Sequence, residues 1–233
     1  MKATAKSILE NFHLLDRARR LRLRINHPFK LSDRAIAARY LAQSNAPKLH
    51  IGCGRNVLAG WLNTDYDPKS PVVMRLDATQ KFPFEKETFD YIFSEHVIEH
   101  FSYWDGLKML TECVRVLQTS GKIRISTPDL AFLIDLTKPN KSDLQRAYIK
   151  SFTSGAPIDN EVFVINSFMR NWGHKFIYDE NTLRGAMTIA GFKKITKRDL
   201  HESEDTALRN LENERRMPPN FLRLETLTLE GGK

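Results

Sequence analysis

From Lys48 onward, short apolar runs alternate with helical stretches, and this alternation constrains the fold more than any other feature of the sequence. Such an alternation is typical of a mostly parallel sheet with helices on both faces. Helices are predicted at 103–117 and 180–190, with two short helical pieces in the irregular segment 128–175. The apolar runs predict strands at 48–52, 61–65, 72–76, 89–94, 122–126, 192–198 and 221–229.

The connection between the first two predicted strands is short. Gly52 and Asp65 are only 13 positions apart, whereas a crossover between parallel strands usually needs about a dozen residues or more including its helix. We therefore expect the first crossover helix to be reduced to a turn or lost. A helix predicted to begin after Ser32 and to run to about Gln43 is our candidate to cover the sheet face left bare.

The net charge of +8 is concentrated near the N-terminus, because residues 1–48 contain eleven Lys and Arg but only three Asp and Glu. Apolar stripes predict a helix over residues 4–25 of this segment. It has three interpretations: a solvated helix that packs on the domain or on a second subunit, an amphipathic helix on an anionic membrane, or an arm that binds RNA phosphates. The near-neutral remainder and the lack of an RNA-binding module disfavour nucleic acid.

The chain is expected to divide into a basic helical extension, 1–47, and an α/β domain, 48–233, in which 128–175 is an insertion. Cys53 and Cys113 lie outside any Cys-x-x-Cys spacing, which indicates a reduced protein and not a disulfide scaffold. No apolar run approaches the ~18–20 residues that span a bilayer, and no secretory signal is recognisable. These features predict a cytoplasmic protein, with peripheral contact at the inner membrane face under the membrane hypothesis.

Glycine and acidic residues follow three of the predicted strands. Gly52 ends the first predicted strand and Gly54 comes just after it, where glycine lets the backbone approach a ligand closely. Asp65 closes the second strand, where a carboxylate can accept hydrogen bonds from both ribose hydroxyls. Asp77 follows the third strand, placed for an adenine amino group with the Ala78 backbone beside it. Together they predict a nucleoside site at the carboxyl edge of the sheet.

These motifs resemble the type-11 class I S-adenosylmethionine-dependent methyltransferases. Residues 48–54 run Lys-Leu-His-Ile-Gly-Cys-Gly and residues 60–65 run Gly-Trp-Leu-Asn-Thr-Asp, which is similar to a subset often associated with polysaccharide and cell-surface sugar pathways. The similarity continues in order through later segments of the chain, at 89–92, 96–100, 112–117, 174–176 and 190–192. One departure is His50, which stands where the family usually has an acidic residue.

The resemblance implies a Rossmann-like, mostly parallel seven-stranded sheet with an antiparallel last strand. It implies S-adenosylmethionine as cofactor and a small-molecule or glycan acceptor, with O-methylation as the expected reaction. An RNA 2′-O-methyltransferase and a non-catalytic S-adenosylmethionine-binding regulator are the alternatives. The predicted cofactor-binding residues are His50, Gly52, Cys53, Gly54, Asp65, Asp77, Ala78, Glu95 and His96.

The histidines after the fourth strand have two interpretations. A helix beginning after Ser94 would place His96 and His100 on one face with Glu99 beside them. In the first interpretation His96 lines the methionine end of the cofactor pocket, while Glu99 and His100 only tie the helix to neighbouring backbone. In the second interpretation, His100 and His174 act as bases, or the histidines and Glu99 together bind a divalent ion.

A metal is the less favoured form of the second interpretation. Plant small-RNA 2′-O-methyltransferases and ubiquinone-pathway O-methyltransferases are similar here and use Glu-x-x-Glu-His for Mg²⁺. In this sequence His96 replaces the first Glu, which weakens a site for an ion that prefers oxygen ligands. We therefore predict His100 and His174 as catalytic residues and assign no metal ligand.

Overall fold

The computed structural model describes residues 31–233. Its strands are β1 (Lys48–Ile51), β2 (Leu62–Asp65), β3 (Met74–Arg75), β4 (Phe89–Glu95), β5 (Leu117–Pro128), β6 (Lys193–Arg198) and β7 (Thr226–Gly232). They form one sheet in the order β3-β2-β1-β4-β5-β7-β6, in which β7 runs antiparallel to both β5 and β6. The predicted fold class is confirmed. The helix predicted over 4–25 lies outside the described residues.

The helices are α2 (Leu31–Gln43), α3 (Tyr103–Val116), α4 (Leu130–Asp135), α5 (Asp143–Phe152), α6 (Glu161–Arg170), α7 (Glu180–Ala190) and α8 (Phe221–Glu225). Local sequence sets several of their ends. The Ser102 hydroxyl accepts a hydrogen bond from the Asp105 amide at the start of α3. Gly191 ends α7 with φ of 112°, a left-handed conformation that favours glycine.

Four predicted boundaries need correction. α2 begins at Leu31, so Ser32 lies inside the helix and does not precede it. β3 is shorter than predicted, and β5 is longer because both β4 and β7 pair along it. The strand predicted at 221–229 begins only at Thr226. Residues 221–225 form α8, whose Phe221 joins the core of the insertion.

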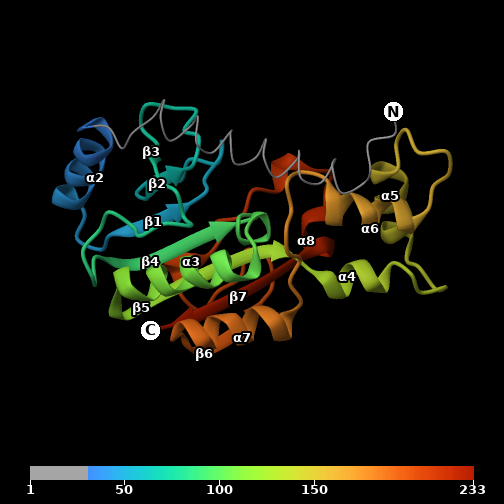
Figure 1. Cartoon of the computed structure of the whole chain (residues 1–233). Coiled ribbons are helices and arrows are strands. Elements are labelled where there is room, and N and C mark those ends of the chain that lie inside the picture. Colours follow the sequence, from blue (N-terminus) through green and yellow to red (C-terminus); the bar gives the residue numbers. More distant parts are fainter. Residues whose placement is uncertain (1–30) are drawn as a thin grey trace, which may run out of the picture.

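One face of the sheet carries the main hydrophobic core. α3 and α7 pack against each other there (Figure 1), over inward-facing side chains of β1, β4 and β5 such as Leu49, Ile92 and Ile123. α2 lies beside β3 at the sheet edge, and its Ala37 belongs to the same core. The Asp33 carboxylate fixes this position by accepting a hydrogen bond from the Arg75 amide at 3.1 Å.

The opposite face is closed by an irregular segment near the C-terminus, residues 199–217, which we call the strap. The first crossover has lost its helix, as expected, and contributes Leu58 and Trp61 to this face. These pack with Phe93 of β4 and with Leu208 and Leu211 of the strap. The expectation that the helix ending at Gln43 covers the bare face is therefore wrong, because α2 joins the core of the other face.

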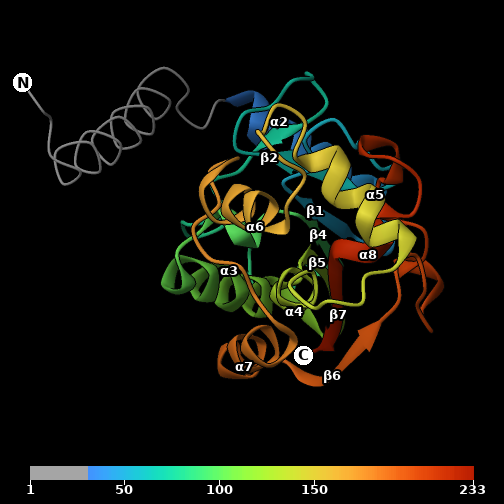
Figure 2. The same cartoon turned by 90° about the vertical axis from the view of Figure 1, so that its right-hand side faces the viewer.

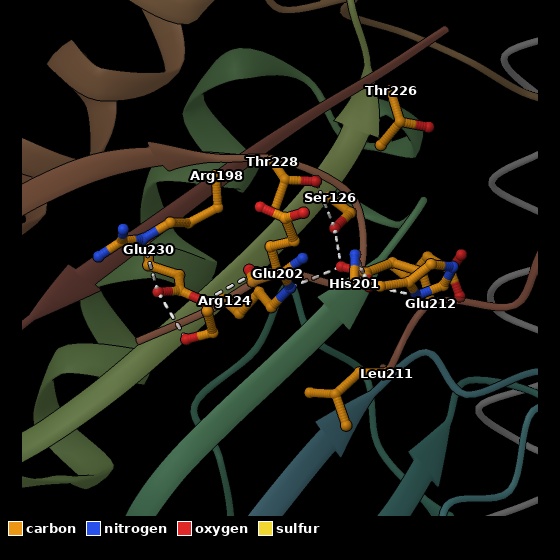
Figure 3. A network of polar contacts seen from close by, with 12 residues as sticks. Arg124, Ser126, Arg198, His201, Glu202, Leu211, Glu212, Thr226, Thr228 and Glu230 are labelled. Carbon is orange, nitrogen blue, oxygen red and sulfur yellow. Dashed lines mark hydrogen bonds and ion pairs between the residues drawn. The ribbon is translucent and has the colours of Figure 1, made fainter. Parts of the chain in front are cut away.

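The strap is held by a buried ionic network (Figure 3). Arg124 of β5 is fully buried, and its guanidinium donates to Glu212 of the strap at 2.5 Å and to Glu230 of β7 at 2.8 Å. It also donates to the backbone carbonyls of Glu202 and Asp199. A guanidinium has five donors in a fixed fork, so this one side chain links the strap to two strands.

The segment 128–175 contains three helices, α4, α5 and α6, where two were predicted. They surround a second hydrophobic core that includes Phe132, Tyr148 and Phe168 and that also receives Phe221 of α8. Figures 1 and 2 show these helices gathered beyond the end of the sheet toward which the β4 arrow points. Among residues 31–233, no helix is both long enough and apolar enough to cross a bilayer.

Candidate active site

The loop after β1 is shaped by two left-handed glycines and by Asp65. Gly52 has φ of 69°, and a Cβ built on it would lie 2.2 Å from the Val97 side chain, so only glycine fits there. Gly54, with φ of 54°, donates its amide hydrogen to Asp65 at 2.8 Å. The second oxygen of Asp65 accepts from the Asp67 amide, also at 2.8 Å. The carboxylate predicted to bind the ribose therefore also holds the loop.

Asp77 is positioned by the turn that follows β3. One of its oxygens accepts hydrogen bonds from the Thr79 amide and hydroxyl, at 3.0 and 2.6 Å. Ala78, the predicted neighbour of the adenine, is buried beside it. Because a carboxylate offers about four acceptor positions, Asp77 keeps acceptor capacity for an amino group.

The structure places His50 and Cys53 differently from the other predicted cofactor residues. The His50 side chain is buried on the strap face, 3.1 Å from the Asn63 side-chain oxygen and with its ring 5.0 Å from that of Phe93. Burial lowers the pKa of His50 to about 4 and so keeps it neutral. Cys53 is buried as well, and burial raises the pKa of its thiol to about 12, so it is not a reactive thiolate. Both side chains are parts of the packed loop.

The end of β4 differs from the predicted helix start. β4 continues through Glu95, and His96 follows with φ of 50°. Only a single 3₁₀ turn, Ile98–His100, comes after it. The prediction that His96 and His100 share one face of a helix is therefore wrong. His96 instead contacts Glu99 at 3.3 Å and the Thr226 hydroxyl of β7 at 3.3 Å.

Glu99, His100 and His174 meet beyond the end of β4. One potential ligand atom from each side chain lies within 4.8 Å of the other two, and the His100 and His174 ring centroids are 4.9 Å apart. The backbone helps to join them, because the Lys175 and Phe176 amides both donate to the Glu99 carbonyl. The turn after β4 and the loop after α6, distant in sequence, thus bring together both predicted catalytic residues.

The electrostatics of this group follow from burial and charge. Burial would raise the pKa of Glu99, but its bond to His96 and the nearby His96 and His100 lower it overall, which keeps the carboxylate ionised. Burial lowers the pKa of His174. Nδ1 of His174 lies 2.8 Å from the Phe168 carbonyl, which can only accept, so that nitrogen carries a proton and Nε2 is free to act as base.

Sequence patterns did not predict the contribution of the strap to this edge of the sheet. The Asn213 amide donates to both oxygens of Glu95, at 3.0 and 3.2 Å, and Arg216 lies 3.9 Å from the same carboxylate. Burial raises the pKa of Glu95, against the opposing effects of Arg216 and His96. The strap thus positions Glu95 from 118 residues away in sequence. No local motif around Asn213 could have revealed this pairing.

Part of the chain matches a known protein family. Residues 49–125 match the family model of a methyltransferase domain. The chain is similar to the solved structure of an S-adenosylmethionine-dependent methyltransferase from Archaeoglobus fulgidus, with 13% identity and a TM-score of 0.49, covering 91% of this chain and 98% of that one. It is also similar to one from Mesorhizobium loti, with 15% identity, a TM-score of 0.47 and coverage of 86% and 96%. No curated protein matches it.

The sheet order, with an antiparallel β7, is that of a Rossmann-like α/β fold, and acidic residues lie at the ends of β2 and β4. The matched segment runs from β1 into β5 and so contains the strand ends that carry these residues. Residues 49–125 carry a methyltransferase domain, and the protein is an S-adenosylmethionine-dependent methyltransferase with S-adenosylmethionine as its methyl donor.

Asp65→Ala is expected to weaken S-adenosylmethionine binding by about tenfold or more, because each charge-assisted hydrogen bond contributes about 1.5–3 kcal/mol. The variant would lose the predicted ribose contacts and the two bonds that hold the loop at Gly54 and Asp67. Isothermal titration with S-adenosylmethionine measures the change. The matched control is Asp67→Ala, which removes a neighbouring exposed carboxylate paired with Lys69. Unchanged affinity in folded Asp65→Ala would show that another carboxylate binds the ribose.

Proposed function

We propose that this enzyme O-methylates a small-molecule or glycan acceptor, and that the pair His100 and His174 takes the proton from the acceptor hydroxyl. The observation that supports this proposal is the meeting of the two imidazoles beside the buried carboxylate of Glu99, beyond the end of β4. A glycan acceptor is further supported by the similarity of residues 48–65 to enzymes of cell-surface sugar pathways.

The proposed chemistry asks little of the protein besides positioning. The sulfonium of the donor makes its methyl group electrophilic, so the enzyme has to hold donor and acceptor oxygen in line and exclude water. A hydroxyl must lose its proton as the new bond forms, which requires a nearby base. Nε2 of His174 is available because Nδ1 donates to the Phe168 carbonyl. The lowered pKa of His174 keeps this base neutral at physiological pH.

A divalent ion held by Glu99, His100 and His174 is the second form of this proposal. Oε1 of Glu99 is buried, and its polar neighbour among the described residues is Nδ1 of His96 at 3.3 Å. A histidine ligand commonly donates its other ring N–H to a backbone carbonyl, as His174 does. Two imidazoles and one carboxylate suit zinc, manganese or iron better than magnesium. Such an ion would supply Lewis-acid activation of the acceptor hydroxyl.

Methyl transfer from labelled S-adenosylmethionine to paired hydroxyl and amine acceptors tests the reaction type. We expect label in alkali-stable ether linkages on hydroxylated sugars and none on the matched amines. Label on nitrogen would contradict O-methylation, label in RNA would favour the RNA 2′-O-methyltransferase alternative, and donor binding without any transfer would favour a regulator. Loss of activity in EDTA that a divalent ion restores would support the metal form, and indifference to EDTA would support metal-free base catalysis.

A further inference from the structure

The outer side of α6 exposes three large apolar side chains beside Asn166 and Arg170, which is unusual for a helix at the surface. Val162, Phe163 and Met169 on this side are 55%, 39% and 43% exposed. Ile158, just before the helix, and Trp172, just after it, are 61% and 54% exposed. We call these five residues the α6 ridge. The other side of α6 is buried through Val164 and Phe168, so the helix carries large apolar side chains on both sides, and a second apolar surface is expected to cover the exposed ones.

The neighbouring helix of the insertion shows that this is not a general property of the region. α5 packs against α6 and buries Tyr148 and Ile149, but its outer positions include the charged residues Asp143, Arg146 and Lys150. An ordinary amphipathic helix has this pattern. The contrast between these two helices indicates a specific use of the outer side of α6.

We propose that the α6 ridge docks on an anionic membrane surface. The ridge offers Trp, Phe and aliphatic side chains, the residues that enter the boundary between headgroups and acyl chains. Lys150 and Arg170 are exposed basic residues of the same segment, whereas Lys138 and Arg146 there are paired with Asp135 and Asp143. The net charge of the whole chain is +8. Residues 1–30 contain eight of its Lys and Arg residues. This charge complements acidic lipids, each basic residue near such a surface contributing about 1 kcal/mol.

The ridge lies next to the candidate base. The Trp172 ring is 5.5 Å from that of His174, and Phe168, on the inner side of α6, provides the carbonyl to which His174 donates. A bilayer docked on the ridge would therefore bring its headgroup layer to the acceptor side of the enzyme. Membrane docking goes beyond the proposed function and can be tested without any acceptor.

Vesicle co-sedimentation of the full chain tests docking. We expect binding to vesicles of mixed phosphatidylcholine and phosphatidylglycerol, and part of it should persist at high salt because apolar contacts are not screened. The triple variant Val162→Gln/Phe163→Gln/Met169→Gln should lose about tenfold or more of this salt-resistant binding. The matched control, Ile189→Gln, changes a residue of α7 that is 67% exposed and away from the ridge, and it should bind like the parent.

S-adenosylmethionine affinity reports whether the triple variant is folded, and the single variant Phe163→Gln repeats the test if it is not. The proposal would be overturned if the folded triple variant bound vesicles as well as the parent does. It would also be overturned if high salt abolished vesicle binding by the parent completely. A parent dimer that the triple variant dissociates, without vesicle binding by either, would show that a second copy of the chain covers the ridge. Vesicle binding and dimerisation are measured without any acceptor, so these results stay the same even if the proposed O-methylation is wrong.

Discussion

Replacing His174 with alanine is expected to lower turnover by about 10²- to 10⁴-fold, the usual contribution of a general base. Affinity for S-adenosylmethionine should stay nearly unchanged. The predicted cofactor residues lie in or just after the first four strands, whereas His174 follows α6. Single-turnover methyl transfer at saturating donor measures the chemical step. His174→Gln, which keeps a polar side chain but no base, should be equally impaired.

The dependence of kcat/KM on pH separates a base from a purely structural histidine. A base acts in its deprotonated form, so activity falls as the pH drops through its pKa. Burial lowers the pKa of His174, which places this acidic limb below the ordinary histidine value of about 6.5. The limb should change or disappear in His174→Ala. Normal turnover by a folded His100→Ala/His174→Ala double variant would rule out both forms of the proposed chemistry and leave positioning alone.

Arg124→Ala is expected to destabilise the fold by about 3–5 kcal/mol, because it leaves buried carboxylates without their cation. Glu212 is fully buried and loses a contact of 2.5 Å, and Glu230 loses one of 2.8 Å while keeping Arg198. The strap also loses the two backbone carbonyl contacts of the guanidinium. Urea unfolding followed by circular dichroism measures the free-energy difference.

Two comparisons make the Arg124 result specific. Arg146→Ala removes an arginine whose ion pair with Asp143 is exposed, and such pairs contribute about 0–1 kcal/mol. Arg124→Met/Glu212→Met removes both partners of the buried pair and should be more stable than Arg124→Ala, because no buried charge is left alone. An unchanged unfolding midpoint in Arg124→Ala would mean that the strap is held by its apolar contacts alone.

Sequence patterning predicted the sheet well because each strand is marked locally. The apolar runs around Leu49, Ile92 and Ile123 all became central strands, and the short span from Gly52 to Asp65 correctly predicted the missing crossover helix. The strap could not be predicted in this way. Its burial depends on Arg124 and Phe93, which belong to other elements, and its own sequence has no apolar periodicity.

In the candidate site, too, some residue positions could be predicted from local sequence and others could not. Gly52 and Gly54 come just after β1, and Asp65 is the last residue of β2, so their approximate positions follow from the order of elements. The conformation of His96 did not follow, because the extension of β4 to Glu95 depends on hydrogen bonds with β5. The approach of His174 to His100 was suggested by motif resemblance alone, since nothing in the residues between them indicates how the insertion folds back.

The strap has a consequence for how the chain acquires its fold. Arg124 and Glu212 are 88 positions apart, and the Asn213 contact with Glu95 spans 118. During synthesis, the first five strands are complete long before the residues that cover one of their faces. Until then Trp61, Phe93 and the Arg124 guanidinium are exposed, and such long-range closure is slow and prone to aggregation. Chains that terminate before residue 199 should therefore be captured by chaperones or degraded, although every parallel strand is already present.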